Sequence, residues 1–258
     1  MFNFLKITPM EIKRPTQQIY SNYTNQDQEV WKTLFNRQMK LLWPIVSKQY
    51  LKAIESVGFK NSEIPNFCEV NKILLSKTSW QLEVVPNISA QKDFFTFLSQ
   101  RKFTATCWLR TMEQLDYLEE PDMFHDVFGH VPLLINHDYV NFFKGISEIA
   151  LKNIDNPRAI ELLGRIYWFT IEFGLIKENE QLKIYGAGII SSKGETLNCL
   201  SKNAKQQTFD IQTIFNTDFR TDVFQENYFV INSFEQLYNS LNEIEVLLEK
   251  NLNPILME

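Results

Sequence analysis

The sequence has few of the features that mark disulfide-rich or membrane-spanning proteins. Its 258 residues include only three cysteines, which lie far apart and form no CxxC pair, so neither a disulfide framework nor a structural zinc site is expected. No run of about 18 apolar residues occurs, and the N-terminus has no apolar segment typical of a signal peptide. We therefore expect a protein of the reducing, cytoplasmic compartment that does not bind a membrane.

Charge of one sign is not concentrated anywhere in the chain either. The formal net charge is −5, and acidic and basic residues are mixed along the sequence. Because no basic field would attract a nucleic-acid backbone, nucleic acid is not an expected partner. The sequence is instead 44% hydrophobic, with 21 phenylalanines and no internal repeat or linker, which predicts one domain with an aromatic core.

The apolar pattern predicts a mostly helical α+β fold with a few short strands. Residues 1–22 mix prolines and polar side chains without a period, which predicts an extended arm on the surface of a single domain of residues 23–258. The first predicted helix begins near Asp27 and is interrupted at Pro44. Further helices are predicted over 45–57, 65–75 and 92–99 and through much of 123–174. The last predicted helix begins at a capping box formed by Ser233 and Gln236 and runs to Leu248. Strands are predicted at 80–85, 103–109, 183–185 and 224–230, with a Gly/Ser loop after the third.

Two of the three histidines in the chain sit five residues apart, in the segment PDMFHDVFGHVP (121–132). On a continuous α-helix such residues point about 140° apart, so both rings could bind one metal only if the helix ends between them. Gly129 and Pro132 are expected to supply that ending. The alternative is that His125 and His130 are ordinary buried histidines bonded to the backbone.

Glu172 lies in the apolar and aromatic segment IYWFTIEFGL (166–175). Burying an isolated carboxylate there would cost several kcal/mol unless a cation or strong hydrogen bonds compensate. A divalent metal would do so; the alternatives are an ion pair with Arg165 or Arg110, or exposure to water. Two imidazoles and one carboxylate make the facial triad of non-haem iron(II) oxygenases, which leaves positions open for dioxygen and substrate.

Three segments resemble the pterin-dependent aromatic amino acid hydroxylases, most closely the short bacterial phenylalanine 4-hydroxylases. They are LDYLEEPDMFHDVFGHVPLL (115–134), IYWFTIEFGL (166–175) and YGAGIISSKGE (185–195), in the family's order and approximate spacing. The resemblance implies a single catalytic domain of that family's fold. It also implies hydroxylation of phenylalanine to tyrosine with iron(II), a tetrahydropterin such as tetrahydrobiopterin, and dioxygen. We expect no N-terminal regulatory module of the animal type and, without a long C-terminal heptad segment, a monomer.

The resemblance also assigns roles to individual residues. It makes His125, His130 and Glu172 the iron ligands and places Tyr117 near the iron. Arg110, at the end of the predicted strand 103–109, would bind the substrate carboxylate through its guanidinium, or else form a surface salt bridge. The implied substrate-binding residues are Arg110, Pro121, Trp168, Ser191 and Thr221; the implied pterin-binding residues are Val85, Asn87, Ile88, Phe94, which would stack on the pterin ring, and Asp126.

The segment RTDVFQEN (220–227) departs from the family's pattern. Thr221 stands where a larger apolar residue is usual, and Glu226 and Asn227 stand where the family usually has Pro-Leu. Because Thr221 would lie near the substrate ring, tryptophan or tyrosine as substrate, or another ring position, stays open as an alternative. So does a metal-binding homologue without turnover. A zinc hydrolase is disfavoured, because no acidic residue occupies the general-base position of a known zinc motif.

Overall fold

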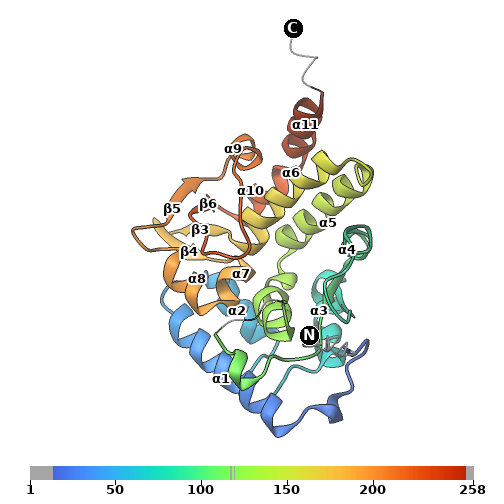
Figure 1. Ribbon diagram of the computed structural model, residues 1–258, viewed down its shortest axis with the longest axis vertical. Helices are drawn as coiled ribbons and strands as arrows, with labels where there is room; N and C mark the ends of the chain where they lie inside the picture. The colour runs from blue at the N-terminus through green and yellow to red at the C-terminus, as the bar shows by residue number, and fades with distance from the viewer. Residues whose placement is uncertain (1–13, 117, 119, 254–258) are drawn as a thin grey trace, which may run out of the picture.

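The computed structural model describes residues 14–116, 118 and 120–253. Helices predominate, and the strands are short, which confirms the predicted α+β fold class (Figure 1). Among the described residues, no helix has both the length and the apolar character needed to cross a membrane. The α-helices are α1 (Asn25–Leu42), α2 (Lys48–Ser56), α3 (Phe67–Thr78), α4 (Gln91–Ser99), α5 (His137–Lys152), α6 (Pro157–Tyr167), α7 (Ala187–Ser191), α8 (Lys193–Asn198), α9 (Ile211–Phe215), α10 (Phe234–Asn239) and α11 (Leu241–Leu252).

Several further segments are helical but not α-helical. The 3-10 helices are η1 (Tyr20–Asn22), η2 (Met112–Gln114) and η4 (Val131–Ile135). Two segments are π-helices, η3 (Phe124–His130) and η5 (Trp168–Glu172). Both π-helices lie in the stretch 123–174 that the sequence predicts to be largely helical, and η5 directly continues α6.

The strands form two small sheets. β1 (Gln81–Val84) pairs in parallel with β2 (Lys102–Ala105), and α4 crosses between them. The second sheet has the order β4-β3-β6-β5, with β3 (Leu175–Glu178) antiparallel to β4 (Gln181–Ile184) and parallel to β6 (Asn227–Ile231), which pairs in parallel with β5 (Lys205–Thr208). Asn179 and Glu180, with φ of 49° and 62°, form the tight turn between β3 and β4.

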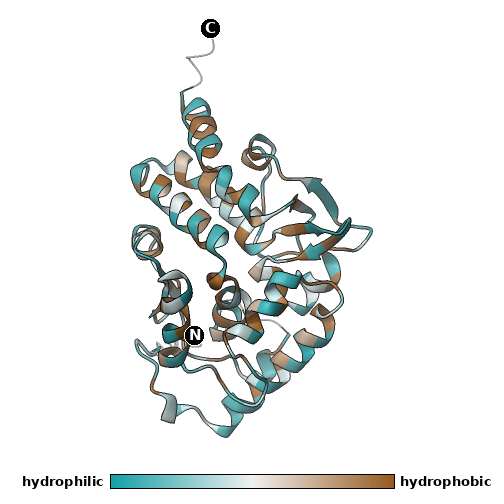
Figure 2. Ribbon diagram, turned by 180° about the vertical axis from the view of Figure 1, so that it is seen from behind, coloured by the Kyte–Doolittle hydropathy of each residue, from teal (hydrophilic) through white to brown (hydrophobic). Residues whose placement is uncertain are grey.

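Aromatic side chains fill much of the core between the helices. The buried face of α5 carries Phe143, whose ring stacks against Phe103, Tyr139 and Tyr167. Hydrophobic segments gather where the helices meet in the middle of the molecule, while the outer helices carry more hydrophilic residues (Figure 2). This packing confirms the predicted aromatic core and surrounds the segments that carry His130 and Glu172.

The described part of the N-terminal arm lies against the domain. Gln18 Nε2 donates to Pro65 O at 2.9 Å, and the Tyr20 hydroxyl donates to Ile64 O at 2.8 Å. Residues 1–13 lie outside the described part of the chain. The division into an arm of residues 1–22 and a domain of residues 23–258 therefore stays a prediction.

Helix α1 begins and ends as the sequence predicts. Thr24 and Asp27 form a capping box at its start, in which each side chain bonds the backbone N–H of the other residue. The helix ends at Leu42, before Pro44. The strand predicted at 103–109, in contrast, already ends at Ala105. Beyond it the chain turns to the segment before η3, where Trp108 O accepts a hydrogen bond from Met123 N at 2.9 Å.

Two further predictions at the C-terminal half are wrong. The Gly/Ser segment after residue 185 is not a loop but the helices α7 and α8, because Ser192 caps α8 by accepting a hydrogen bond from Glu195 N. The predicted last helix is divided into α10 and α11 at Ser240, whose N–H bonds back to Gln236 O and Leu237 O. Both helices bury apolar side chains, Phe234 and Leu237 from α10 and Ile244 and Leu248 from α11.

Candidate metal centre and its surroundings

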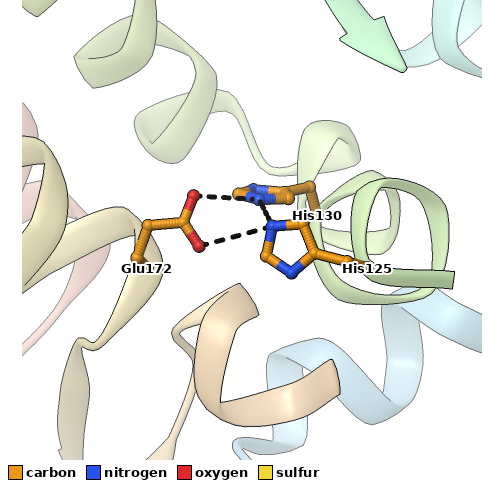
Figure 3. Close-up of side chains that lie close together, drawn as sticks. All are labelled: His125, His130 and Glu172. Carbon is orange, nitrogen blue, oxygen red and sulfur yellow. Dashed lines mark hydrogen bonds and ion pairs between the residues drawn. The ribbon is translucent and has the colours of Figure 1, made fainter. Parts of the chain in front are cut away.

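His125, His130 and Glu172 meet between the two π-helices (Figure 3). His130 Nε2 lies 3.1 Å from Glu172 Oε1, His125 Nε2 lies 3.7 Å from Glu172 Oε2, and the two Nε2 atoms are 3.4 Å apart. One potential ligand atom from each residue lies within 4.8 Å of the other two. The structure thus brings together the three side chains that the sequence singled out.

The predicted helix end between the two histidines is wrong. Phe124–His130 is one continuous π-helix, in which hydrogen bonds join residues five apart. Side chains at i and i+5 therefore face the same side, as they do not on an α-helix. Gly129 lets α7 pack closely on this turn, since a Cβ at that position would lie 3.0 Å from Ala187 O. Pro132 lies in the following 3-10 helix, η4.

Glu172 is buried, with 9% of its surface exposed, and His130 is 2% exposed. Burial by itself would raise the pKa of Glu172. Positive charge on His130 and His125, together with a hydrogen bond from the Tyr167 hydroxyl, outweighs burial and lowers this pKa to about 2. The site is therefore built to hold a carboxylate next to positive charge, which a metal cation supplies when the imidazoles are neutral.

An arginine partner for Glu172, the alternative left open by the sequence, is not found among the residues that the structure describes. Arg165 instead bonds Glu161, Asp218 and the carbonyl of Phe215. Arg110 bonds Asp122.

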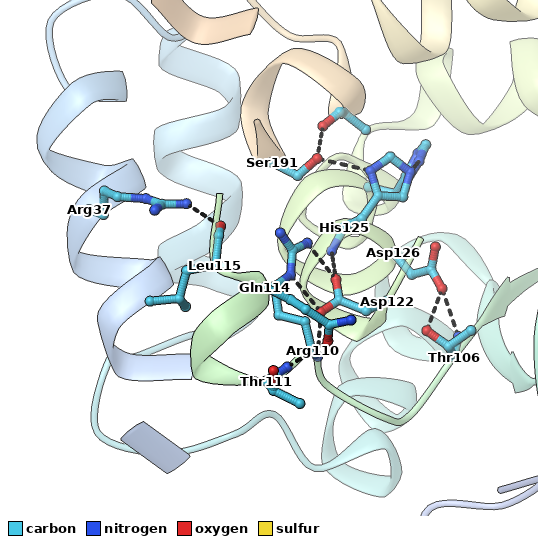
Figure 4. A network of polar contacts seen from close by, with 12 residues as sticks. Arg37, Thr106, Arg110, Thr111, Gln114, Leu115, Asp122, His125, Asp126 and Ser191 are labelled. Carbon is cyan, nitrogen blue, oxygen red and sulfur yellow. Dashed lines mark hydrogen bonds and ion pairs between the residues drawn. The ribbon is translucent and has the colours of Figure 1, made fainter. Parts of the chain in front are cut away.

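Ser191, the last residue of α7, fixes the orientation and tautomer of His125 (Figure 4). Its Oγ lies 2.9 Å from His125 Nδ1 and donates its one hydrogen to Ala187 O at 2.9 Å. The hydroxyl must then accept from His125 Nδ1–H. Nε2 of His125 is left with a lone pair directed toward Glu172 and His130, which is the form of imidazole that binds a metal.

The donor set fits a transition metal. Two imidazole nitrogens and a carboxylate on one side of the ion form the facial arrangement preferred by non-haem iron(II).

The second nitrogen of His130 has apolar surroundings. His130 Nδ1 is buried and has no hydrogen-bond partner among the described residues. The neighbouring ring of Phe103, with its centroid 4.9 Å from that of the imidazole, packs beside it.

Arg110 is held in a buried, bidentate pair with Asp122 (Figure 4). Its Nε donates to Asp122 Oδ2 at 2.9 Å and its Nη2 donates to Oδ1 at 2.7 Å. Asp122 Oδ1 also accepts from the backbone N–H of His125 at 3.3 Å. The predicted alternative of a surface salt bridge is wrong. Asp122 itself was not predicted, although its place three residues before His125 is typical of a residue that binds the first N–H groups of a helix.

Trp168 opens the π-helix that ends in Glu172. Its half-buried indole stacks on Phe219 at 4.4 Å between ring centroids and packs on Phe173 at 4.6 Å. The indole Nε1 donates to Gln225 Oε1 at 2.9 Å, a contact that the sequence did not predict.

The other residues assigned to substrate binding lie nearer the surface. Thr221 is exposed in the loop that leads to Gln225, and Pro121 is half-buried next to Asp122. Tyr117 lies outside the described residues.

The residues assigned to pterin binding lie on the segment after β1, on α4 and on η3. Val85 continues β1, since its N–H donates to Ala105 O at 3.0 Å, whereas Asn87 and Ile88 are exposed. Phe94 on α4 is half-buried and meets the ring of Tyr167 edge-on. Asp126 is buried beside the site, and its Oδ2 accepts from the N–H and hydroxyl of Thr106 at 2.7 and 2.9 Å (Figure 4). Burial raises the pKa of Asp126.

Comparison with known proteins places this geometry in a family. Residues 6–254 match the family model of the biopterin-dependent aromatic amino acid hydroxylases. The phenylalanine-4-hydroxylase of Ralstonia nicotianae is 41% identical over 225 residues, which cover 87% of this chain and 72% of that protein. A crystal structure of Chromobacterium violaceum phenylalanine hydroxylase with bound Fe(III) has a TM-score of 0.87 at 39% identity, covering 93% of this chain and 86% of that one. A second, with iron(III) and 7,8-dihydrobiopterin, has a TM-score of 0.86 at 39% identity and covers 92% and 86%. The chain therefore belongs to the biopterin-dependent aromatic amino acid hydroxylase family.

Proposed function

We propose that this protein is a phenylalanine 4-monooxygenase, which uses iron(II), a tetrahydropterin and dioxygen to hydroxylate the ring of phenylalanine to tyrosine. The observation that carries the proposal is the convergence of His125, His130 and Glu172, whose ligand atoms lie within 4.8 Å of one another. The relatives that bear the name phenylalanine-4-hydroxylase support the reaction, and the related structures with iron and dihydrobiopterin support the cofactors.

In this proposal His125, His130 and Glu172 would hold the iron. The iron and the pterin together supply the activation of dioxygen. The chain would contribute placement, because Ser191 would keep the His125 lone pair directed at the metal. The burial of His130 and Glu172 would limit the access of water to the reacting groups.

The substrate is bound by Arg110, Pro121, Trp168, Ser191 and Thr221 in this proposal. Arg110 uses two of its five N–H donors on Asp122, and the others can bind the carboxylate of an amino acid. Asp122 thereby fixes the direction of the guanidinium. The part of the half-buried Trp168 indole that Phe219 and Phe173 leave uncovered would line the pocket for the substrate ring.

The pterin is bound by Val85, Asn87, Ile88, Phe94 and Asp126. Asp126 supports this assignment, because Thr106 occupies only Oδ2 and the other carboxylate oxygen can accept from N–H groups of a pterin. The exposed Ile88, at 70%, offers an apolar side chain that a flat ring could cover.

Product analysis tests the reaction. The protein is purified without oxygen, loaded with Fe(II), and supplied with a tetrahydropterin, dioxygen and each aromatic amino acid in turn. We expect tyrosine from phenylalanine, identified by mass and retention time, and pterin oxidation that requires both Fe(II) and phenylalanine. Hydroxylated tryptophan, a dihydroxyphenylalanine or another tyrosine isomer as the main product would correct the substrate or ring position. Metal binding without any product would contradict the proposal.

A matched pair of variants tests the ligand set. Glu172→Ala is expected to weaken Fe(II) binding by at least about 100-fold, because the loss of a direct ligand exceeds the cost of losing a group that only orients one. Glu55→Ala, on the exposed side of α2, serves as the control and is expected to bind iron like the wild type. Anaerobic titration of Fe(II) measures both. Equal affinities of the two variants would contradict the assignment of Glu172.

We also infer that the protein is a monomer of the cytoplasmic compartment. The three cysteines are free, Cys107 and Cys199 are buried, and the described residues contain no helix that could cross a membrane. Sedimentation velocity is expected to give a single species of 30.5 kDa, and a dimer would contradict this inference.

A further inference from the structure

Gln225 is a buried glutamine whose polar groups are all engaged. Only 6% of its surface is exposed. Its Oε1 accepts from Trp168 Nε1 at 2.9 Å, and its Nε2 donates to the carbonyls of Arg220 at 2.7 Å and Val223 at 3.1 Å. Such a residue cannot be exchanged for an apolar one without leaving buried groups unpaired.

The Oε1 contact controls the orientation of the Trp168 indole. Phe219 and Phe173 pack against the indole, but stacked rings can slide in their common plane. The hydrogen bond to Gln225 is directional and fixes the edge of the indole that carries Nε1. Because Trp168 begins the π-helix whose last residue is Glu172, its ring is fixed relative to the ligand helix.

The two Nε2 contacts close the loop that carries Thr221. The carbonyls of Arg220 and Val223 both accept hydrogen bonds from Gln225 Nε2. These two bonds fix the start and the end of the turn around Thr221. The other polar contact there, between Arg220 and Asp222, is exposed and contributes little to rigidity.

The backbone of Gln225 is attached to α8, which follows the segment that carries Ser191. Gln225 N donates to Glu195 Oε1 at 2.8 Å, and Asn198 Nδ2 donates to Gln225 O at 2.8 Å. One residue therefore joins the Trp168 indole, the loop of Thr221 and helix α8.

We propose that Gln225 is a positioning residue for the aromatic amino acid: it holds the Trp168 indole and the Thr221 loop as one rigid wall beside the metal ligands. This inference rests on the proposed function, in which Trp168 and Thr221 contact the substrate. Affinity for the amino acid should then depend on Gln225, although its side chain does not contact the substrate. Affinity for the pterin and for iron should not, because the residues assigned to them receive none of the Gln225 hydrogen bonds.

The test uses Gln225→Met, which keeps the length of the side chain and removes its hydrogen bonds. We expect KM for phenylalanine to rise at least about tenfold, because one well-placed hydrogen bond accounts for about that factor and the variant loses three. KM for the pterin and the dissociation constant of Fe(II) should stay within about twofold of wild type. Calorimetric titration of phenylalanine into the Fe(II)-loaded protein without oxygen should show the same loss of affinity without turnover.

Two further variants separate positioning from stability. Tyr228→Phe removes the hydroxyl that donates to Glu195 in the same buried cluster and leaves the Gln225 amide intact. It should lower the melting temperature without changing either KM. In the Trp168→Phe background, Gln225→Met should change KM for phenylalanine by a smaller factor than in wild type, because the indole N–H is already absent.

Each result decides between the explanations. Equal changes in both KM values, a KM change in Tyr228→Phe as large as in Gln225→Met, or the same factor in both Trp168 backgrounds would overturn the role of Gln225. If the wild type neither binds nor hydroxylates an aromatic amino acid, the proposed function fails and this inference fails with it. If the wild type does both and Gln225→Met matches it, only this inference fails.

Discussion

Ser191 has one hydroxyl hydrogen, and the carbonyl of Ala187 receives it. The hydroxyl therefore acts on His125 only as an acceptor, and it selects the tautomer whose Nε2 can bind a metal. At the scale of single residues, the candidate centre thus depends on groups that would not touch the ion. Asp122 holds Arg110 in place, and Ser191 holds His125.

Ser191→Ala should weaken Fe(II) binding by about 10-fold to 100-fold, because His125 loses the partner that orients its ring. Ser192→Ala is the adjacent control: it removes the cap of α8, costs about 1 kcal/mol of stability, and should leave iron affinity unchanged. Anaerobic Fe(II) titration and urea unfolding of both variants measure the two effects. Equal iron affinity in the two variants would refute the role of Ser191.

Glu195 gives the protein a pH-dependent contribution to stability. Burial raises the pKa of Glu195, so the folded state holds the proton more tightly than the unfolded chain does. This contribution is fully present below the pKa of the unfolded chain and is lost as pH rises through the higher folded pKa. Glu195→Gln cannot titrate, so its free energy of unfolding should fall less with rising pH than that of the wild type. Urea unfolding between pH 4 and 8 measures the slopes, and parallel slopes would show that Glu195 does not contribute.

At the scale of secondary structure, the two π-helices determine how His125, His130 and Glu172 come to face one another. The sequence predicted that His125, His130 and Glu172 lie together, because histidines are rare in the chain and Glu172 is the acidic residue of an apolar helix. It did not predict how His125 and His130 face one side, because the expectation was based on the α-helical period. A π-helix differs from an α-helix by one residue in a turn, and no single side chain in FHDVFGH marks that difference.

Other elements were missed because their sequence signal is weak. β5, with the sequence KQQT, is a polar strand at the edge of its sheet and shows no apolar alternation. α7 and α8 contain Gly188 and Gly194, which are usual in loops. The long-range contacts of Gln225 with Trp168 and Glu195 join residues 57 and 30 positions apart, and no local pattern reports them. Long helices with clear caps, such as α1, were predicted well.

Gly186 marks a close approach between elements, since a Cβ there would lie 2.4 Å from Glu172 O and 2.5 Å from Gly174 N. Gly186→Ala should therefore destabilise the protein by about 1–3 kcal/mol, and it should weaken iron binding because η5 must shift. Gly164→Ala is the control, since a Cβ on Gly164 inside α6 would meet nothing within 4 Å and alanine favours a helix, which predicts a gain of about 0.5–1 kcal/mol. Urea unfolding measures both changes, and opposite signs are required.

At the scale of the whole molecule, the candidate ligands come from two segments that lie 42 residues or more apart along the chain. His125 and His130 belong to one segment, and Glu172 belongs to the other. A metal that binds only when these segments are assembled stabilises the folded state. Fe(II) at about 100 times its dissociation constant should add about 2.7 kcal/mol of stability, which corresponds to a rise of roughly 5–10 °C in Tm for a domain of this size.

Anaerobic thermal melts with Fe(II), with chelator and with Mg²⁺ check this expectation. Mg²⁺ prefers oxygen ligands and a complete octahedral shell, so it should produce little shift at a centre with two imidazoles. His130→Ala should abolish the Fe(II) shift. An Fe(II) shift of the same size in that variant would place the stabilising metal elsewhere in the molecule.

The extra residue in each π-helix also has a genetic consequence. Loss of a single codon within Phe124–His130 or Trp168–Glu172 would give the segment the residue count of an ordinary α-helical turn. The side chains on one side of the lesion would then rotate by about 100° relative to those on the other. Because both segments carry buried core side chains, among them Phe124, Phe128 and Phe169, such in-frame deletions should misplace core residues as well as the candidate metal-binding side chains. They should therefore yield protein that unfolds more readily than the wild type and does not bind Fe(II).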